Sequence, residues 1–180
     1  MKTLIIDNGS KWTKELSQFI DGEKIQIDMK NISSVDTESF NLIILSGSHG
    51  GPSVLTNTLL DREFSLVKES KVPIIGVCYG AEVIAHSYGG ILEKMEGEHK
   101  GMTHLYLENG KELAVYEAHR FRIKQLPEEF IVLGRSDHSI EYFKHKDKPL
   151  YGIQFHPEAF VEITEGQEVW KSILNDIMSV

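Results

Sequence analysis

Cysteine and long apolar runs are scarce in this sequence, and both shortages exclude classes of protein. The one cysteine, Cys78, leaves no partner for an internal disulfide, so the chain is not a small secreted domain held by such bonds. No apolar run approaches the roughly 20 residues of a membrane-spanning helix, and the apolar stretch after Met1 is too short for a signal sequence. The sequence therefore predicts a cytoplasmic protein without membrane association.

Positive charge is also in short supply. The 19 basic residues against 27 acidic ones give a net charge of −8, which does not favour binding to nucleic acid or to anionic membranes. The 180 residues, 41% of them hydrophobic and 26% charged, have the composition of a globular protein with a real core. Because no linker, repeat or low-complexity tract interrupts them, we expect one domain over residues 1–180.

The first half of the chain alternates short apolar runs with helical patterns. The runs at 4–6, 42–45 and 74–77 are continuously apolar, as in parallel strands covered on both faces. Residues 24–29 alternate instead and predict a half-buried strand near an edge. Apolar spacings typical of helices lie between these runs, at 16–20 and 60–67.

After residue 90 the pattern changes to short segments typical of β-strands. These segments are 91–92, 104–107, 112–116, 130–133, 140–143 and 151–155, and an Asn-Gly pair at 109–110 predicts a hairpin turn. A last helix is predicted where Thr164 and Gln167 have the spacing of a capping box. The expected fold class is α/β: an open, mostly parallel sheet flanked by helices, with added antiparallel strands.

The first candidate for chemistry is the Gly-Val-Cys-Tyr-Gly segment 76–80, where a predicted strand runs into a predicted helix. Glycines two residues to either side of Cys78 are typical of the sharp turn called a nucleophile elbow. A cysteine at a helix N-terminus is also expected to have a lowered pKa, because unpaired N–H groups there favour the thiolate. The alternative is an inert, buried thiol at the end of a core strand.

A second candidate follows the predicted strand 151–155 in the sequence Gln-Phe-His-Pro-Glu, 154–158. Pro157 favours extended backbone at His156, so His156 and Glu158 can project to the same side. A carboxylate that orients an imidazole, which in turn faces a thiol, is the arrangement of a catalytic triad. The alternative is a solvated turn. Both candidates follow predicted strands of one sheet, where crevices of α/β proteins open.

The glycine-rich loop 46–53 follows another buried strand. Its backbone N–H groups are candidates for an oxyanion hole together with the N–H of Tyr79. A phosphate-binding loop is a weaker reading because the Gly-Lys-Ser/Thr ending is absent, and an ordinary flexible turn is a third. No metal site is expected from the remaining polar residues. The histidines lack zinc-like spacing, and three glutamates suggest a solvated loop; these residues are His86, His99, His104, His138, His145, Glu93, Glu96 and Glu98.

Taken together, the loop after 42–45, the segment 76–80 and the segment 154–158 resemble the class I glutamine amidotransferase family in order and spacing. The resemblance covers essentially the whole chain. Within the family, residues 6–13 and 149–158 look most similar to the glutaminase subunit of archaeal-type GMP synthetases.

This resemblance implies hydrolysis of glutamine through a cysteinyl thioester, without a cofactor. Cys78 would be the nucleophile, His156 the acid and base, and Glu158 the group that orients His156. The N–H of Tyr79 and that of Gly47 or Ser48 would hold the oxyanion. The ammonia would pass to a separate ATP-dependent synthetase (ATP pyrophosphatase) subunit, because no such module or pyrophosphatase loop is present in this sequence.

The sequence departs from the family pattern at the expected glutamine pocket. Glu82 stands where a glutamine that contacts the substrate is usual, and it either faces the pocket or turns outward. Segment 117–121 aligns through His119 and Phe121, but Arg120 replaces a small residue. Arg120 has the chemistry to pair with the substrate carboxylate or with Glu82. Our hypothesis is that Glu82 and Arg120 changed together.

In the glycine-rich loop 46–53, Ser48 either replaces the second glycine of the family pattern or marks an insertion. These departures leave two alternatives to a glutaminase subunit. One is a stand-alone γ-glutamyl hydrolase or peptidase, and the other is a weakly active relative that binds a partner. The presence of cysteine, histidine and glutamate at the three triad positions weighs against the second.

Overall fold

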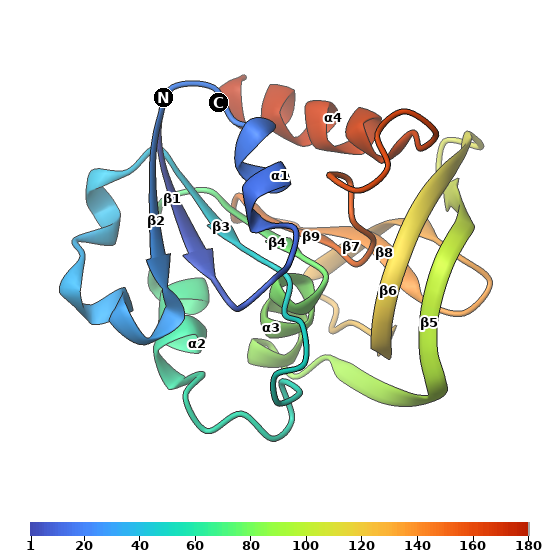
Figure 1. Ribbon diagram of the computed structural model, residues 1–180, viewed down its shortest axis with the longest axis horizontal. Helices are drawn as coiled ribbons and strands as arrows, with labels where there is room; N and C mark the ends of the chain where they lie inside the picture. The colour runs from blue at the N-terminus through green and yellow to red at the C-terminus, as the bar shows by residue number, and fades with distance from the viewer. Residues whose placement is uncertain (180) are drawn as a thin grey trace.

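The computed structural model describes residues 1–179 and consists of a twisted nine-stranded sheet with helices on both faces (Figure 1). The strand order is β2-β1-β3-β4-β9-β8-β7-β5-β6. The five strands at the beginning of this order are parallel: β2 (Glu23–Asp28), β1 (Lys2–Asp7), β3 (Leu42–Leu45), β4 (Ile74–Val77) and β9 (Leu150–Ile153). The predicted edge position of β2 is confirmed. Ile25 and Ile27 of this strand are partly buried, and its other residues are exposed.

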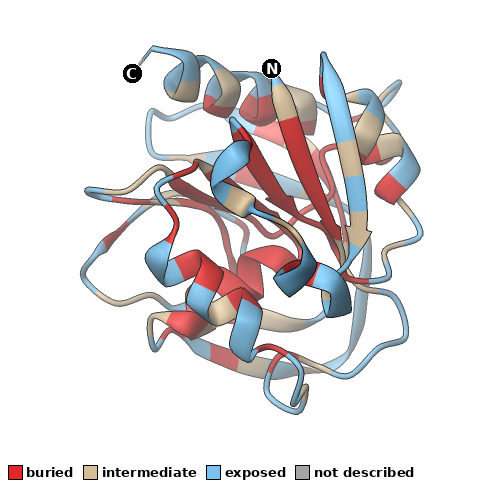
Figure 2. Cartoon of the chain, turned by 90° about the vertical axis from the view of Figure 1, so that its left-hand side faces the viewer, coloured by how far each residue is buried: buried red, intermediate tan, exposed pale blue. Residues whose placement is uncertain are grey.

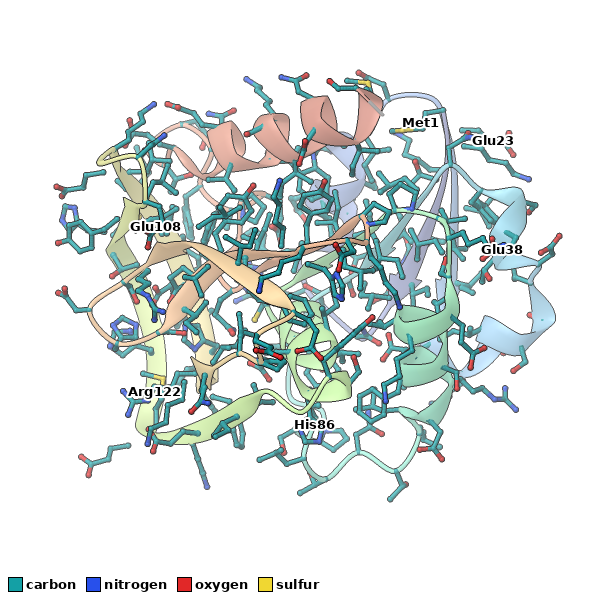
Figure 3. All side chains as sticks on the ribbon, turned by 180° about the vertical axis from the view of Figure 1, so that it is seen from behind. Met1, Glu23, Glu38, His86, Glu108 and Arg122 are labelled. Carbon is teal, nitrogen blue, oxygen red and sulfur yellow. The ribbon has the colours of Figure 1, made fainter. Side chains whose placement is uncertain are left out.

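Four antiparallel strands extend the sheet, as predicted: β8 (Ile140–His145), β7 (Phe130–Arg135), β5 (Ile91–Leu107) and β6 (Glu112–Gln125). The long β5–β6 hairpin stands at the side of the molecule, and Glu108 and Arg122 mark its two ends in Figure 3. Its turn uses the Asn-Gly pair as expected: Gly110 has a φ of +84°, and Leu107 N–H donates to Lys111 O at 2.8 Å.

The expectation of two short strands and an acidic loop between residues 91 and 107 was wrong. Strand β5 runs through this whole segment, Glu93, Glu96 and Glu98 included. Pairing with β6 on both sides of an irregular stretch at 95–98 makes this segment part of one long strand. Glu93 lies opposite Arg122 in the ladder and forms ion pairs with it and with Lys124.

The helices pack in two layers. Helices α1 (Thr13–Gln18) and α4 (Gly166–Met178) cover one face of the parallel strands, and α2 (Asp61–Glu69) and α3 (Tyr79–Ser87) cover the other (Figure 1). Two 3-10 helices, η1 (Met29–Ser34) and η2 (Thr37–Ser39), connect β2 to β3. Figure 2 shows the buried residues concentrated in the central strands and in the helix faces turned toward them. No helix in residues 1–179 is both long and apolar enough to cross a membrane.

The predicted capping box of α4 is not formed. Thr164 Oγ1 donates to Ala159 O at 3.1 Å, and Gln167 Nε2 donates to Val161 O at 3.4 Å. Both side chains therefore stabilise the turn that precedes the helix, and the N-cap residue is Glu165, without a side-chain cap.

Candidate active site

The carboxyl ends of four parallel strands meet at one edge of the sheet, and the candidate residues follow them directly. The register pairs Ile6 with Leu45, Leu45 with Gly76, and Val77 with Ile153. Cys78 continues this ladder, because its N–H donates to Ile153 O at 2.7 Å. The three segments that were singled out from the sequence thus lie side by side, as the predicted topology required.

Cys78 lies at a strained turn between β4 and α3. Its φ of 51° and ψ of −106° are unusual for a residue with a side chain. The flanking glycines permit close backbone contacts. A Cβ atom at Gly76 would lie 2.4 Å from Gly80 O, and one at Gly80 would lie 2.2 Å from Leu45 O. Glycine at both positions is therefore a steric requirement of this turn, which has the conformation expected of a nucleophile elbow.

His156 and Glu158 are in direct contact, as their spacing predicted. His156 Nδ1 and Glu158 Oε1 are 2.8 Å apart, and both side chains are buried. The backbone N–H of His156 donates to Tyr116 O at 2.8 Å, which fixes the segment against β6. When Nδ1 donates its hydrogen to the carboxylate, Nε2 of the neutral ring carries the lone pair and is free to accept a proton.

Gly47 lies between the imidazole and the cysteine. A Cβ atom at Gly47 would be 3.1 Å from His156 Cε1 and 3.6 Å from Cys78 Cβ. The first distance is tight and the second is an ordinary contact, so a side chain here would press on the imidazole of His156. Ser48, which is partly buried, follows it on the wall of the adjoining cavity.

The expected lowering of the Cys78 pKa is wrong for this arrangement. Burial raises the pKa of the thiol, and the negative charge of Glu82 raises it further. His119 and the N–H of Tyr79 lower it, but they do not outweigh burial. The N-terminus of α3 alone thus does not maintain a thiolate, and the thiol needs a base at the moment of attack.

A cavity of about 570 Å³ opens beside Cys78. All four residues predicted to bind substrate line it, as does the glycine-rich loop; these four are Glu82, His119, Arg120 and Phe121. Lys94, Glu98 and Ala118 complete the wall on the β5–β6 side. Ala118 O is 3.9 Å from Cys78 Sγ, so β6 passes directly over the sulfur.

Glu82 does not turn outward. It is 4% exposed, and its Oε1 accepts a hydrogen bond from Gln154 Nε2 at 3.2 Å. Burial raises the pKa of Glu82 to about 7, against smaller opposing effects of His119 and Gln154. The proposed pairing of Glu82 with Arg120 is not formed within residues 1–179: both residues line the cavity, but Glu82 is buried and Arg120 is exposed. Arg120 therefore remains free to meet a carboxylate that enters from solvent.

A buried polar cluster near the cavity was missed by sequence reasoning. Glu117 and His119 of β6, His138 of the β7–β8 connection and Glu141 of β8 converge on one another. The spacing of the histidines along the chain gave no sign of it, because the ladder and not the local sequence brings them together. The available signal was the i, i+2 spacing of Glu117 and His119, which places both on one face of a strand.

Burial and mutual contact have opposing effects on the titration of this cluster. Burial raises the pKa of Glu117, but the charge of the neighbouring His119 and a hydrogen bond from His138 outweigh it and lower the value overall. Burial lowers the pKa of His119, yet contact with Glu117 and the charge of Glu141 raise it to about 9. Burial and the neighbouring Glu117 raise the pKa of Glu141.

The sheet order, the strained turn and the His–Glu pair define a class of protein. The family model "Glutamine amidotransferase class-I" matches residues 4–175, and the chain belongs to this family of glutamine-hydrolysing enzymes. The resemblance drawn from the motifs is thereby confirmed.

Among relatives, the chain is similar to a glutamine-hydrolysing GMP synthase subunit of Methanocaldococcus jannaschii, with 31% identity over 185 residues and 94% of each chain covered. It is 30% identical over 170 residues to the GMP synthase of Spiroplasma kunkelii, and spans about a third of that longer protein's length. The crystal structure of a GMP synthase subunit from Thermoplasma acidophilum superposes with a TM-score of 0.86 at 25% identity, covering 99% of this chain and 94% of the other.

Proposed function

We propose that this chain hydrolyses glutamine to glutamate and ammonia, with Cys78 as nucleophile, His156 as acid and base, and Glu158 as the group that orients His156. The observation that carries the proposal is the meeting of the strained cysteine turn and the buried His156–Glu158 pair at Gly47. The raised thiol pKa supports a role for His156, because a protonated thiol needs an acceptor for its proton.

The reaction proceeds in two halves. His156 Nε2 accepts the Cys78 thiol proton as sulfur attacks the side-chain carbonyl carbon of glutamine. Collapse of the tetrahedral intermediate breaks the carbon–nitrogen bond, and His156 returns the proton to the departing ammonia. Water then attacks the γ-glutamyl thioester with His156 as base, and glutamate leaves as the thiol is restored.

Backbone N–H groups stabilise the negative oxygen of each tetrahedral intermediate. Tyr79 N–H already faces the sulfur, and Gly47 or Ser48 supplies the second donor from the glycine-rich loop. We infer that Arg120, which lines the cavity, binds the α-carboxylate of glutamine, and that the buried Glu82, protonated below about pH 7, acts as a hydrogen-bond donor.

The ammonia is proposed to serve GMP synthesis in a separate ATP-dependent synthetase (ATP pyrophosphatase) subunit, in the cytoplasm. Similarity to the Methanocaldococcus jannaschii GMP synthase subunit over 94% of both chains supports this assignment. Such an enzyme is expected to release ammonia slowly alone and faster in the presence of nucleotides and the synthetase subunit.

The test is ammonia release from glutamine by the wild-type chain and by Cys78→Ala and Cys78→Ser. Both variants should lose at least a thousandfold in rate while their circular dichroism is unchanged. Activity retained in Cys78→Ala would refute the nucleophile. Robust cleavage of γ-glutamyl peptides without any partner would instead favour a stand-alone γ-glutamyl hydrolase or peptidase.

A further inference from the structure

We propose that Glu117, His119, His138 and Glu141 form a binding site for one divalent transition-metal ion of the zinc class, behind the wall of the glutamine cavity. One ligand atom from each of these four residues lies within 4.8 Å of all the others. The residues come from β6, β8 and the connection that precedes β8, so the β7–β8 hairpin and β6 meet at this point.

The separations between ligand atoms suit four-coordinate binding. Glu117 Oε2 is 2.9 Å from His138 Nε2 and 3.5 Å from His119 Nε2. Neighbouring ligand atoms of a tetrahedral site with bonds of about 2.0–2.1 Å are about 3.3 Å apart. Small side-chain movements would therefore admit an ion at the centre of the cluster.

Three buried atoms of the cluster have no hydrogen-bond partner among the described residues: Glu117 Oε1, His119 Nε2 and Glu141 Oε2. Glu117, His119 and Glu141 are at most 4% exposed. Unpaired buried polar atoms are costly, and carboxylates without a cation are especially so. Unpartnered polar atoms on three buried side chains of the cluster are the second, independent sign of a ligand.

The outer contacts hold these groups as metal ligands are usually held. His119 Nδ1 donates to Phe121 O at 2.7 Å, which leaves the lone pair on Nε2 facing the cluster. Ser136 Oγ donates to Glu141 Oε1 at 2.9 Å and leaves Oε2 free. A backbone carbonyl behind a histidine and a hydroxyl behind a carboxylate orient ligands and increase metal affinity.

The donor set selects the class of ion. Two imidazoles and two carboxylates favour Zn²⁺ and similar first-row ions over Mg²⁺ or Ca²⁺, which prefer oxygen ligands alone. His99 Nδ1, 3.2 Å from Glu117 Oε2, lies on the more exposed side of the cluster. A bound ion would tie β6 to β8 and fix the backbone of Ala118 over the Cys78 sulfur.

The experiment uses the whole chain after EDTA treatment and dialysis. Titration with Co²⁺ is followed by visible absorption, and titration with Zn²⁺ by calorimetry. We expect one ion per chain, the strong visible bands of four-coordinate Co²⁺, and a raised Tm with Zn²⁺. Binding should persist in Cys78→Ser, without a thiolate-to-metal charge-transfer band in the near ultraviolet.

Two variants locate the ion, and one serves as control. His138→Asn and Glu141→Gln should each weaken Zn²⁺ binding at least tenfold. His104→Asn, which removes an exposed histidine paired with Glu112 on the same hairpin, should bind as the wild type does.

Absence of stoichiometric binding would show that the cluster holds protons only and would overturn the proposal. Equal affinity in all variants, or a thiolate band that Cys78→Ser abolishes, would overturn it as well. If the cluster variants do not fold, the wild-type Co²⁺ spectrum and its displacement by Zn²⁺ decide.

Discussion

At the scale of single residues, a buried carboxyl group four positions after Cys78 adds to the effect of burial in raising the pKa of the thiol. Glu82 is held by Gln154, and the pKa of Glu82 is about 7, so its charge appears in the range where a cysteine enzyme works. As pH rises through this value, the new negative charge opposes loss of the Cys78 proton. Glutamine at this position would keep the hydrogen bond without the charge.

Glu82→Gln is therefore expected to lower the pKa of the Cys78 thiol by about one unit, since a like charge a few ångströms away is removed. The rate of alkylation by iodoacetamide between pH 6 and 10 measures this shift. Glu98→Gln, on the exposed wall of the same cavity, is the matched control and should leave the profile unchanged. Identical profiles for wild type and Glu82→Gln would contradict this view of the thiol.

The candidate active-site residues could be predicted from the sequence, whereas their electrostatics could not. Cys78, His156 and Glu158 carry local signals: paired glycines and a proline that restrains the backbone. The pKa of Cys78 depends on how deeply the chain buries it and on charges from α3 and β6. The same holds for the cluster around Glu117, whose members are distant in sequence.

At the scale of elements, close backbone contacts constrain the connection from β4 to α3. Gly80 lies in the first turn of α3 and packs against the end of β3, with no room for a Cβ atom next to Leu45 O. The conformation of Cys78 thus depends on contacts among β3, β4 and α3.

Gly80→Ala should therefore destabilise the fold by about 3 kcal/mol or more and displace the cysteine, because backbone atoms must move to relieve the clash. Urea unfolding and the rate of thiol alkylation report the two effects. Ala81→Gly at the next position, which adds flexibility and removes one buried methyl group but makes no clash, should cost only about 2 kcal/mol. Equal losses for both variants would contradict the steric explanation.

The type of an element could be predicted from the sequence where a strand is buried on both faces. The continuous apolar runs of β1, β3 and β4 predict strands covered on both faces, and the structure has them. Strand β5 was missed between 93 and 103 because this stretch is polar and largely exposed, so it lacks the apolar pattern of a strand. The capping box failed because Thr164 and Gln167 have nearer partners in the preceding turn.

At the scale of the whole molecule, burial of acidic groups makes stability depend on pH. Glu63 on α2 is fully buried, and neither carboxylate oxygen has a hydrogen-bond partner in residues 1–179. Burial raises the pKa of Glu63 from 4.5 to about 7, against a smaller opposing effect of Asn8. The folded chain therefore binds this proton more tightly than the unfolded chain does. The protonated Glu63 adds to the free energy of unfolding below about pH 4.5, and this gain is lost as pH rises from about 4.5 to 7.

Glu63→Gln is expected to raise the free energy of unfolding at pH 8 by about 2–3 kcal/mol and to change it little at pH 4, where both states of the wild type are protonated. Urea unfolding at the two pH values measures the difference. Glu69→Gln, at an exposed position of the same helix, is the control and should have no such pH dependence. A gain of the same size at both pH values would show that packing and not ionisation is responsible.

The most direct test of the central proposal, that Cys78 carries the γ-glutamyl group of glutamine, is mass spectrometry of the chain quenched in acid during turnover. We predict one γ-glutamyl adduct, on the peptide that contains Cys78, absent from Cys78→Ala and lost on treatment with hydroxylamine. Ammonia release without any adduct on that peptide, or an adduct on another residue, would contradict the account.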